Sequence, residues 1–263
     1  MPNGVYSNAF SGRRLFSFMV LFSYLGQYCL LLYMAIRSCA EFGTYRKNLV
    51  SEIVKTGFDS IPLIVLTGAF TGAVMTIQTA YQIESGYFPN TIIGSIVTQS
   101  LVLELAAGIT SLVLAGRVGA RIATELGTMR VSEQIAALDS MGFNSVTFLV
   151  VPRIMAGILM FPVVYIVATT TGITGGVVAG MSTGAIVAEE FLMGAKPYFL
   201  PQDVAFGFIK SFVFGFVITS VACYKGFFAS GGAEGVGRAT TQAAVMGCTY
   251  VLLSDLILAF FFL

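Results

Sequence analysis

The stretch SIPLIVLTGAFTGAVMTIQTAYQI, residues 60–83, contains no charged side chain and lies between Asp59 and Glu84. Roughly 20 apolar residues in helical conformation cross the hydrocarbon core of a bilayer. The stretch is long enough and apolar enough to do so. It therefore predicts a transmembrane helix, and the rest of the chain can be analysed outward from it.

The composition of the whole chain agrees with this assignment. Its 263 residues are 56% hydrophobic and only 10% charged, and the mean hydropathy is +0.87. Such values are typical of a chain whose solvent is mostly lipid. We predict an all-α, polytopic integral membrane protein.

Four further apolar stretches predict spans, near residues 91–116, 154–182, 204–224 and 239–263. Charged residues within them are rare, but Glu104, Lys210 and Asp255 fall inside the second, fourth and fifth span. An ionised side chain is costly inside a bilayer. We therefore expect these three side chains to face a cavity or one another rather than lipid.

The N-terminal stretch LFSFMVLFSYLGQYCLLLYMAI, residues 15–36, is long enough to span but has Arg residues on both sides. Its polar residues fall near one helical stripe: Ser17, Tyr24, Gln27 and Tyr28. Such a stripe is typical of a helix that lies in the membrane interface. Hydropathy alone leaves both possibilities open. We divide the chain into an N-terminal cytoplasmic or interfacial region, residues 1–52, and a membrane domain, residues 53–263.

Basic residues indicate how the spans are oriented, because cytoplasmic loops carry an excess of Lys and Arg. With five spans and a cytoplasmic N-terminus, the inner side holds every Lys and Arg except Lys196, which lies outside, and Lys210, which lies within a span. We therefore expect a cytoplasmic N-terminus and a C-terminus, Leu263, on the outer side.

Several functional classes are disfavoured by composition. The chain has no histidine, which removes the commonest general base and the commonest metal ligand. The cysteines, at positions 29, 39, 223 and 248, show no C-x-x-C spacing. A net charge of +1 gives no dense basic patch for nucleic acid. We expect no metal, no cofactor and no nucleic-acid partner.

The glycine-rich stretch GGAEGVGRATTQ, residues 231–242, raises the question of a phosphate-binding loop. The G-x-x-x-x-G-K-[ST] pattern needs a Lys and a hydroxyl, and these positions hold Arg238 and Ala239. The pattern must also follow a buried strand, whereas an apolar helical segment precedes it here. We interpret the stretch as a turn between two hydrophobic segments.

Small residues recur at fourfold spacing in two spans, a pattern that lets helix backbones approach closely in lipid. The stripes comprise Gly172, Gly176, Gly180 and Gly184 in one span, and Gly207, Ser211, Gly215 and Thr219 in the other. They predict close helix packing, either within the chain or at a dimer seam.

The longest inner loop, residues 117–153, contains the pattern of a short helix. Ser132 is a plausible N-cap, Ile135, Leu138 and Met141 follow at helical spacing, and Gly142 is a stop signal. We predict a short amphipathic cytoplasmic helix. It either lies flat on the bilayer or docks into a groove of another protein.

The run AGRVGARIATELGTMRVSEQIAAL, residues 115–138, closely resembles the signature of MlaE-type, or YrbE-like, permeases. These are the membrane subunits of ABC lipid transporters. The segments GAFTGAVMTIQ, FIKSFVFG and YKGFFASGGAEGVGRATTQAAV resemble the same family. The matches extend from about residue 52 to the C-terminus, so the resemblance covers the predicted membrane domain.

The resemblance implies a homodimeric, five-span permease in the bacterial inner membrane, with the N-terminal stretch as an interfacial helix and a periplasmic C-terminus. It implies transport of phospholipid or a related lipid, with ATP hydrolysed by a separate MlaF-like ATPase, so that the chain itself is not an enzyme. An MlaD-like MCE-domain protein is implied on the outer face, and some such systems add an MlaB-like STAS-domain protein.

The resemblance also implies roles for particular residues. The ATPase would dock on a coupling helix at residues 130–142, through Arg130, Glu133, Gln134, Ala137 and Leu138. The residues that we assign to a lipid cavity are Gln78, Tyr81, Leu103, Glu104, Lys210 and Asp255. Family members place a basic residue before the acidic one in the second span, where this chain has Leu103. The resemblance therefore gives Glu104 no ion-pair partner within its own span.

Two other functions fit the same residues. An ion-coupled secondary transporter would use Glu104, Lys210 and Asp255 as a proton relay. It would keep working without any ATPase. A membrane scaffold that transports nothing would tolerate the neutralisation of all three charges.

Overall fold

The computed structural model describes residues 26–37, 42–83 and 89–262, and the regular secondary structure in these ranges is helical. Five stretches of helix are long and apolar enough to cross a membrane: Arg46–Ile83, Thr91–Val131, Val146–Ser182, Pro201–Phe227 and Gly232–Phe262. The predicted all-α, polytopic class and the number of spans are confirmed.

Short irregular turns divide these stretches into separate elements. In chain order they are α2 (Phe42–Thr56), the 3₁₀ turn η1 (Phe58–Ser60), α3 (Ile61–Ile83), α4 (Thr91–Ser100), the π-helical turn η2 (Leu101–Leu105), α5 (Ala106–Leu114), the π-helical turn η3 (Ala115–Gly119), α6 (Ala120–Val131), α7 (Gln134–Ser140), the π-helical turn η4 (Val146–Val150), α8 (Val151–Ser182), α9 (Ala188–Ala195), the 3₁₀ turn η5 (Lys196–Tyr198), α10 (Pro201–Phe227) and α11 (Gly232–Phe262).

The helices extend beyond the apolar stretches from which the spans were predicted. The second helix was expected to end near residue 116, but it continues through α6 to Val131, and the next begins at Val146. The reason is that α6 buries Ile122 and Leu126, where it packs against α10 and α11. Its charged residues lie on other sides of the helix. The boundary after residue 52 likewise falls inside α2.

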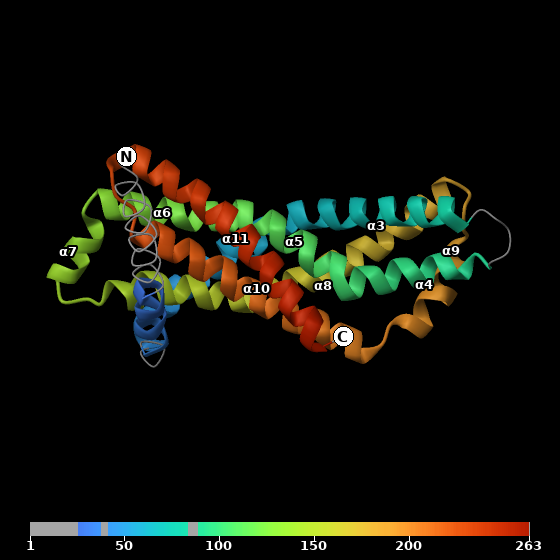
Figure 1. Cartoon of the computed structure of the whole chain (residues 1–263), viewed down its shortest axis with the longest axis horizontal. Helices are drawn as coiled ribbons and strands as arrows, with labels where there is room; N and C mark the ends of the chain where they lie inside the picture. The colour runs from blue at the N-terminus through green and yellow to red at the C-terminus, as the bar shows by residue number, and fades with distance from the viewer. Residues whose placement is uncertain (1–25, 38–41, 84–88, 263) are drawn as a thin grey trace, which may run out of the picture.

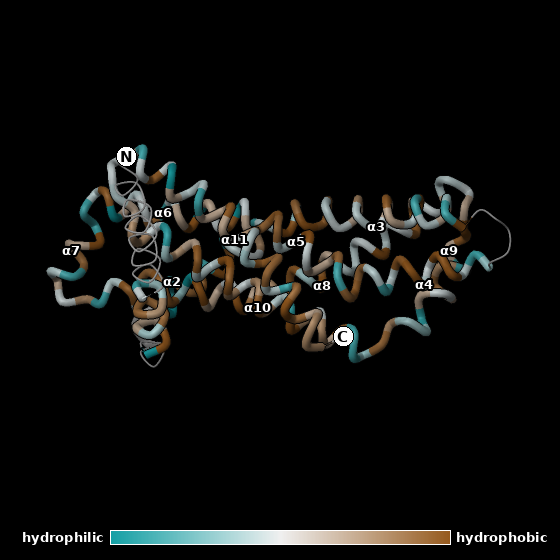
Figure 2. Tube along the Cα trace, in the orientation of Figure 1, coloured by the Kyte–Doolittle hydropathy of each residue, from teal (hydrophilic) through white to brown (hydrophobic). Residues whose placement is uncertain are grey.

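The bundle is elongated, and most helices run roughly along its long axis (Figure 1). Hydrophilic residues gather at the end formed by α6 and α7, and hydrophobic residues follow the helices between the two ends (Figure 2). This distribution is typical of a bundle whose middle lies in lipid and whose α7 end lies in water.

The helix at residues 26–37 runs across the long axis of the bundle (Figure 1). The Tyr28 hydroxyl lies 2.8 Å from the Ser220 hydroxyl of α10, and Leu32 lies beside Ile154 of α8. A helix that crosses the bundle axis has the orientation expected of an interfacial helix, so the interfacial interpretation of this stretch stays a prediction. The rest of the predicted N-terminal stretch, residues 15–25, lies outside the described residues.

Glycines allow the close approach of α3 and α8. A Cβ atom at Gly72 would collide with the backbone of Gly172, and one at Gly176 with the Thr76 side chain. Three more glycines of the two stripes also lie against the same chain: Gly180 against Ile186, Gly207 against Tyr165, and Gly215 against Gly157. Packing within the chain therefore accounts for five of the six glycines in the stripes. The sixth, Gly184, follows the end of α8 with a left-handed φ of 69°, and a Cβ atom there would have no neighbour within 4 Å.

We expect Gly72→Ala to destabilise the bundle, because the added methyl group would push α3 away from the backbone of α8. The cost of overpacking is about 1–3 kcal/mol, partly offset by the better helix propensity of Ala. The matched control is Gly108→Ala, since a Cβ atom there has no neighbouring atom within 4 Å. The measurement is the thermal unfolding of detergent-solubilised protein. Equal melting temperatures for the two variants would contradict this account of the packing.

Candidate functional site

Three charged side chains from three spans meet inside the bundle. The Lys210 ammonium of α10 lies 2.5 Å from Glu104 Oε2 of η2 and 2.7 Å from Asp255 Oδ1 of α11. We call these three residues the ion-pair centre. The expectation that the intramembrane charges face one another is confirmed for this chain.

The local backbone around Glu104 is a π-helical turn. The Ala106 amide donates to the Leu101 carbonyl, five residues earlier. Single π turns within α-helices are often found at functional sites. The Tyr165 hydroxyl of α8 donates to the Val102 carbonyl at 2.9 Å, in a buried contact, and so satisfies a backbone group of this turn.

Tyr165 is a residue of this site that sequence reasoning missed. Its ring occupies the space that a side chain at position 207 would need, and it packs edge to face with Phe208 at 5.5 Å. Gly207 had been assigned to helix packing without a partner. The sequence contained one signal for this contact: Gly207 precedes Lys210 by three residues, so both lie on the same side of α10, one turn apart.

The ion-pair centre is sealed on one side and open on the other. Lys210 is fully buried, whereas 47% of the Glu104 side-chain surface is exposed. The Lys210 ammonium also lies 4.8 Å from the centroid of the Phe206 ring, a favourable arrangement for a cation over an aromatic face. Next to Glu104, Gly108 has open space where a side chain would be. The exposed carboxylate of Glu104 is therefore the part of the centre that another molecule could reach.

The remaining residues assigned to a lipid cavity lie apart from this centre, except Leu103, which is partly buried beside Glu104. On α3, Thr67 and Thr71 border the turn that carries Glu104. Gln78 is seven residues beyond Thr71, or about 10 Å along the helix, and both it and Tyr81 are exposed. Periodicity could place these residues on a helix but could not set the height of that helix against its neighbours.

A short helix at the hydrophilic end of the bundle confirms the short helix that was predicted in the loop at residues 117–153. It is α7, Gln134–Ser140, and Ile135 is its buried residue. Gly142 follows with a left-handed φ of 81°, as expected of a stop signal. Among the residues assigned to ATPase coupling, Arg130, Glu133, Gln134 and Ala137 are exposed, and Leu138 is partly buried.

The start of α7 differs from the prediction. Ser132 was expected to be the N-cap, but its hydroxyl donates to the Thr128 carbonyl of α6. The residue before α7 is instead Glu133, in a left-handed conformation with φ 60°. A left-handed backbone is costly for a residue with a side chain. At Glu133 this conformation turns the chain from the direction of α6 into that of α7.

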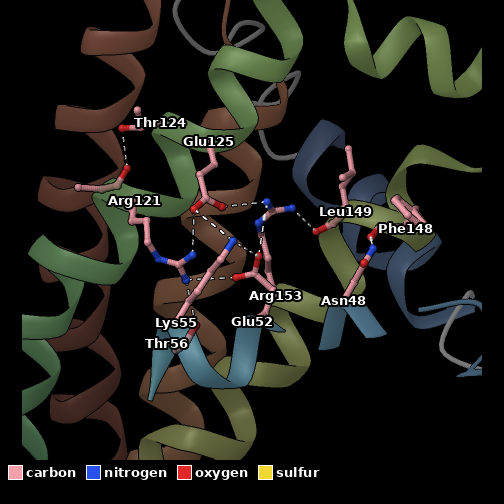
Figure 3. Close-up of polar contacts among 11 residues, drawn as sticks. Asn48, Glu52, Lys55, Thr56, Arg121, Thr124, Glu125, Phe148, Leu149 and Arg153 are labelled. Atoms are coloured by element: carbon pink, nitrogen blue, oxygen red, sulfur yellow. Dashed lines mark hydrogen bonds and ion pairs between the residues drawn. The ribbon is translucent and has the colours of Figure 1, made fainter. Parts of the chain in front are cut away.

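Charged residues of α2, α6 and α8 form a network that joins these three helices (Figure 3). Arg121 of α6 lies 3.2 Å from Glu52 of α2, and Arg153 of α8 lies 3.0 Å from Glu125 of α6. Arg121 also pairs with Glu125 within α6, at 3.1 Å. We call these four residues, together with Lys55, the cytoplasmic charge network.

The cytoplasmic charge network holds the two helices that flank α7. Arg153 is nearly buried, and its guanidinium also donates to the Leu149 carbonyl at 2.7 Å. Only the basic residues of this network contributed to the predicted orientation of the spans. The spacing of Arg121 and Glu125, four residues apart on one helix, was a signal for an ion pair, but nothing in the sequence indicated their partners on α2 and α8.

We expect Lys210→Met to destabilise the protein strongly, because it leaves two carboxylates together without their cation. Removing one partner of a buried ion pair costs about 3–5 kcal/mol, and the exposure of Glu104 should place this case near the lower value. Adding Glu104→Gln and Asp255→Asn removes the unpaired charges, so the triple variant should regain part of the loss. Thermal unfolding in detergent measures both effects. A triple variant no more stable than Lys210→Met alone would contradict the assignment.

Comparison with known proteins agrees with this architecture. A family model described as Permease MlaE matches residues 49–261. A probable ABC transporter permease protein of Rickettsia bellii is 35% identical over 231 residues, which cover 88% of this chain and 89% of that protein. The protein TRIGALACTOSYLDIACYLGLYCEROL 1, chloroplastic, of Arabidopsis thaliana is 33% identical over 216 residues, covering 82% of this chain and 61% of that protein.

A third relative is named for its transport activity. The intermembrane phospholipid transport system permease protein MlaE of Haemophilus influenzae is 29% identical over 238 residues, which cover 90% of this chain and 91% of that protein. The match to the family model covers the ion-pair centre, α7 and all but the outermost residues of the five candidate spans. The chain therefore belongs to the MlaE family of ABC transporter permeases.

Proposed function

We propose that this chain is the membrane subunit of a homodimeric ABC transporter that moves phospholipid between the bacterial inner membrane and an MCE-domain partner. The observation that carries this proposal is the family match over residues 49–261, together with a relative named for phospholipid transport. The ion-pair centre and the exposed α7 supply the chemistry that such a subunit needs.

The energy for transport comes from a separate ATPase subunit. The glycine-rich stretch at residues 231–242 forms the turn before α11 and its first turns, and an α-helix, α10, precedes it. It lacks the strand on which a phosphate-binding loop is built. In contrast, α7 projects at one end of the bundle with most of its residues exposed (Figure 1), and a short exposed helix fits a groove in a partner.

We propose that the ATPase docks on α7 and that the cytoplasmic charge network carries its movement into the bundle. The network connects α6 and α8, which flank α7, to α2. A displacement of α7 therefore acts on three helices together. On the opposite face we propose the MCE-domain partner. Some systems of this kind add a STAS-domain protein on the ATPase.

The lipid cavity that we propose lies at the dimer seam, beside Glu104. The exposed carboxylate and the open space at Gly108 would admit a polar head group, while the buried Lys210 holds both carboxyl groups in place. A head group that carries a cationic amine would pair with the exposed carboxylate.

The proposed orientation places the α7 end in the cytoplasm, because this end carries most of the Lys and Arg residues. The start of α11 then lies inside and Phe262 outside. Single cysteines labelled from each side of the membrane test this orientation. A cysteine near the C-terminus that reacts only from the cytoplasm would overturn it.

Reversing the charge at the start of α7 should uncouple the ATPase. We expect Glu133→Lys to leave folding intact, since Glu133 is exposed, and to weaken ATPase binding at least tenfold. Truncating one partner of a buried interfacial charge pair costs about 2–5 kcal/mol, and charge reversal should cost no less. Binding of the ATPase and lipid-stimulated ATP hydrolysis are measured in detergent.

Glu189→Lys is the matched control, because Glu189 is an exposed acidic residue of α9, at the other end of the bundle. It should leave ATPase binding unchanged. If the Glu133→Lys variant binds its ATPase and transports lipid normally, α7 is not the docking helix.

Neutralising the exposed member of the ion-pair centre tests the lipid cavity. Glu104→Gln keeps the size of the side chain but removes its charge, so we expect a folded dimer with transport reduced about tenfold or with altered head-group preference. ATP-dependent lipid transfer between vesicles and acceptor protein is the measurement, with Glu189→Gln as the control. Normal transport and lipid loading by Glu104→Gln would exclude the cavity, and transport without any ATPase would favour the ion-coupled alternative.

A further inference from the structure

A groove distinct from the ion-pair centre lies between α10, α11 and the helix at residues 26–37. It encloses about 510 Å³, and its walls include Tyr28, Tyr224, Leu253 and Ile257. Apolar and aromatic side chains with a few polar groups are typical of a site for an amphipathic ligand. In a membrane protein the available amphipathic molecule is a lipid.

One charged side chain lines this groove, and it is a cation. Lys225 lies near the end of α10 and donates to the amide oxygen of Gln242 at 3.3 Å. Within the described residues no carboxylate forms an ion pair with it, whereas Arg121, Arg153 and Lys210 all have carboxylate partners. An unpaired, half-buried ammonium in an apolar groove attracts an anion.

The dimensions of the groove match a lipid that enters from one leaflet. α10 ends two residues after Lys225, so in the proposed orientation the ammonium lies near the cytoplasmic membrane interface, in the groove that Tyr28 of the helix at residues 26–37 also lines. From there the groove follows α11 from Met246 to Ile257, a rise of about 16 Å. This length accommodates most of one acyl chain. Basic sites between spans on the cytoplasmic side are known to hold anionic head groups.

The groove also leads toward the ion-pair centre. Ser254 and Ile257 line its far end, and Asp255 lies between them in the sequence. Lys225 and Lys210 are 15 residues apart on α10, or about 22 Å. A lipid with its phosphate at Lys225 would therefore point its acyl chain toward the charges that we assign to the transport cavity.

We propose that this groove is an entry site for an anionic glycerophospholipid of the cytoplasmic leaflet, with the phosphate at Lys225 and one acyl chain between α10 and α11. The inference rests on the proposed function for its role in transport. Its binding step can be tested without transport.

The chain has no tryptophan, so a single introduced tryptophan reports on its own surroundings. Leu253→Trp places the reporter in the groove, and Leu252→Trp places it next along α11 on a residue that does not line the groove. Both leucines are about half exposed. Full-length protein in detergent is titrated with phosphatidylglycerol that carries brominated acyl chains, which quench tryptophan fluorescence on contact.

We expect saturable quenching of the Leu253→Trp variant at low lipid and only weak, non-saturating quenching of the Leu252→Trp variant. Adding Lys225→Gln should weaken binding about tenfold, as expected for the loss of one charge-assisted contact. Lys47→Gln, at an exposed position of α2, should have no effect. Phosphatidylcholine with the same chains should bind more weakly, and inorganic phosphate should not displace the lipid.

A second measurement uses protein without an introduced tryptophan, so that the groove keeps its own side chains. Native mass spectrometry should find fewer phosphatidylglycerol molecules retained by Lys225→Gln than by the wild type or by Lys47→Gln. Equal quenching of the two reporters, or no effect of Lys225→Gln in either measurement, would overturn the proposal. Lys225 would then be a lysine whose side chain extends to the membrane interface without binding a lipid. Absent quenching together with loss of the dimer in Leu253→Trp would assign the groove to a second copy of the chain.

These outcomes are separable from failure of the proposed function. Saturable binding in the groove with no ATP-dependent lipid transfer would retain the site and reject the transporter. Transfer that depends on Glu104 but not on Lys225 would retain the transporter and reject the entry site.

Discussion

The buried ammonium of Lys210 is the constraint on which the middle of the bundle depends. A fully buried cation in a membrane protein is tolerated only when opposite charges surround it. Here the two carboxylates come from two other spans. The second, fourth and fifth spans are therefore fixed in rotation and height by the two ion pairs of one ammonium group, and other packing in this region must accommodate them. The same contact leaves one carboxylate oriented toward open space.

Neighbouring residues are arranged to keep that contact. The π turn adds one residue to the helix, which rotates the following part by about 100° relative to a continuous α-helix. The freed backbone is held by Tyr165, and Tyr165 fits only because position 207 is a glycine. Sequence features that look independent, such as a small residue, a buried tyrosine and an acidic residue, thus form one unit.

Much of this fold could be predicted from the sequence, because the hydrophobic effect and the helical period act locally. Apolar stretches identified all five spans, Gly142 marked the end of α7, and small residues marked close packing. The helix ends were less predictable. α6 carries Arg121 and Glu125 yet remains helical, because their charges are satisfied by α2 and α8, and such partners depend on tertiary structure.

Similar reasoning explains which site residues were predicted. Glu104, Lys210 and Asp255 could be identified because each charge is costly in its own span. Gln78 and Tyr81 could not be positioned, since the relative height of two helices is set by contacts such as those of Gly72 with Gly172. Tyr165 and the cytoplasmic charge network carry no local sign of their partners.

The two clusters of charged residues differ in their physical properties. The cytoplasmic charge network is rigid, whereas the ion-pair centre is accessible to another molecule. In the cytoplasmic charge network the ion pairs join three helices, and Glu52 and Arg153 are nearly buried, so this layer favours movement of α2, α6 and α8 as one body. The ion-pair centre has one more carboxyl group than ammonium group, and its most exposed member is the Glu104 carboxyl group. An ABC transporter permease needs both properties. A rigid group of helices transmits a movement of the partner subunit, and an accessible site can then respond to that movement while it holds a ligand. The spacing of the layers along the second span, from Glu104 to Arg121, is 17 residues or about 25 Å, which is most of the thickness of a hydrocarbon core.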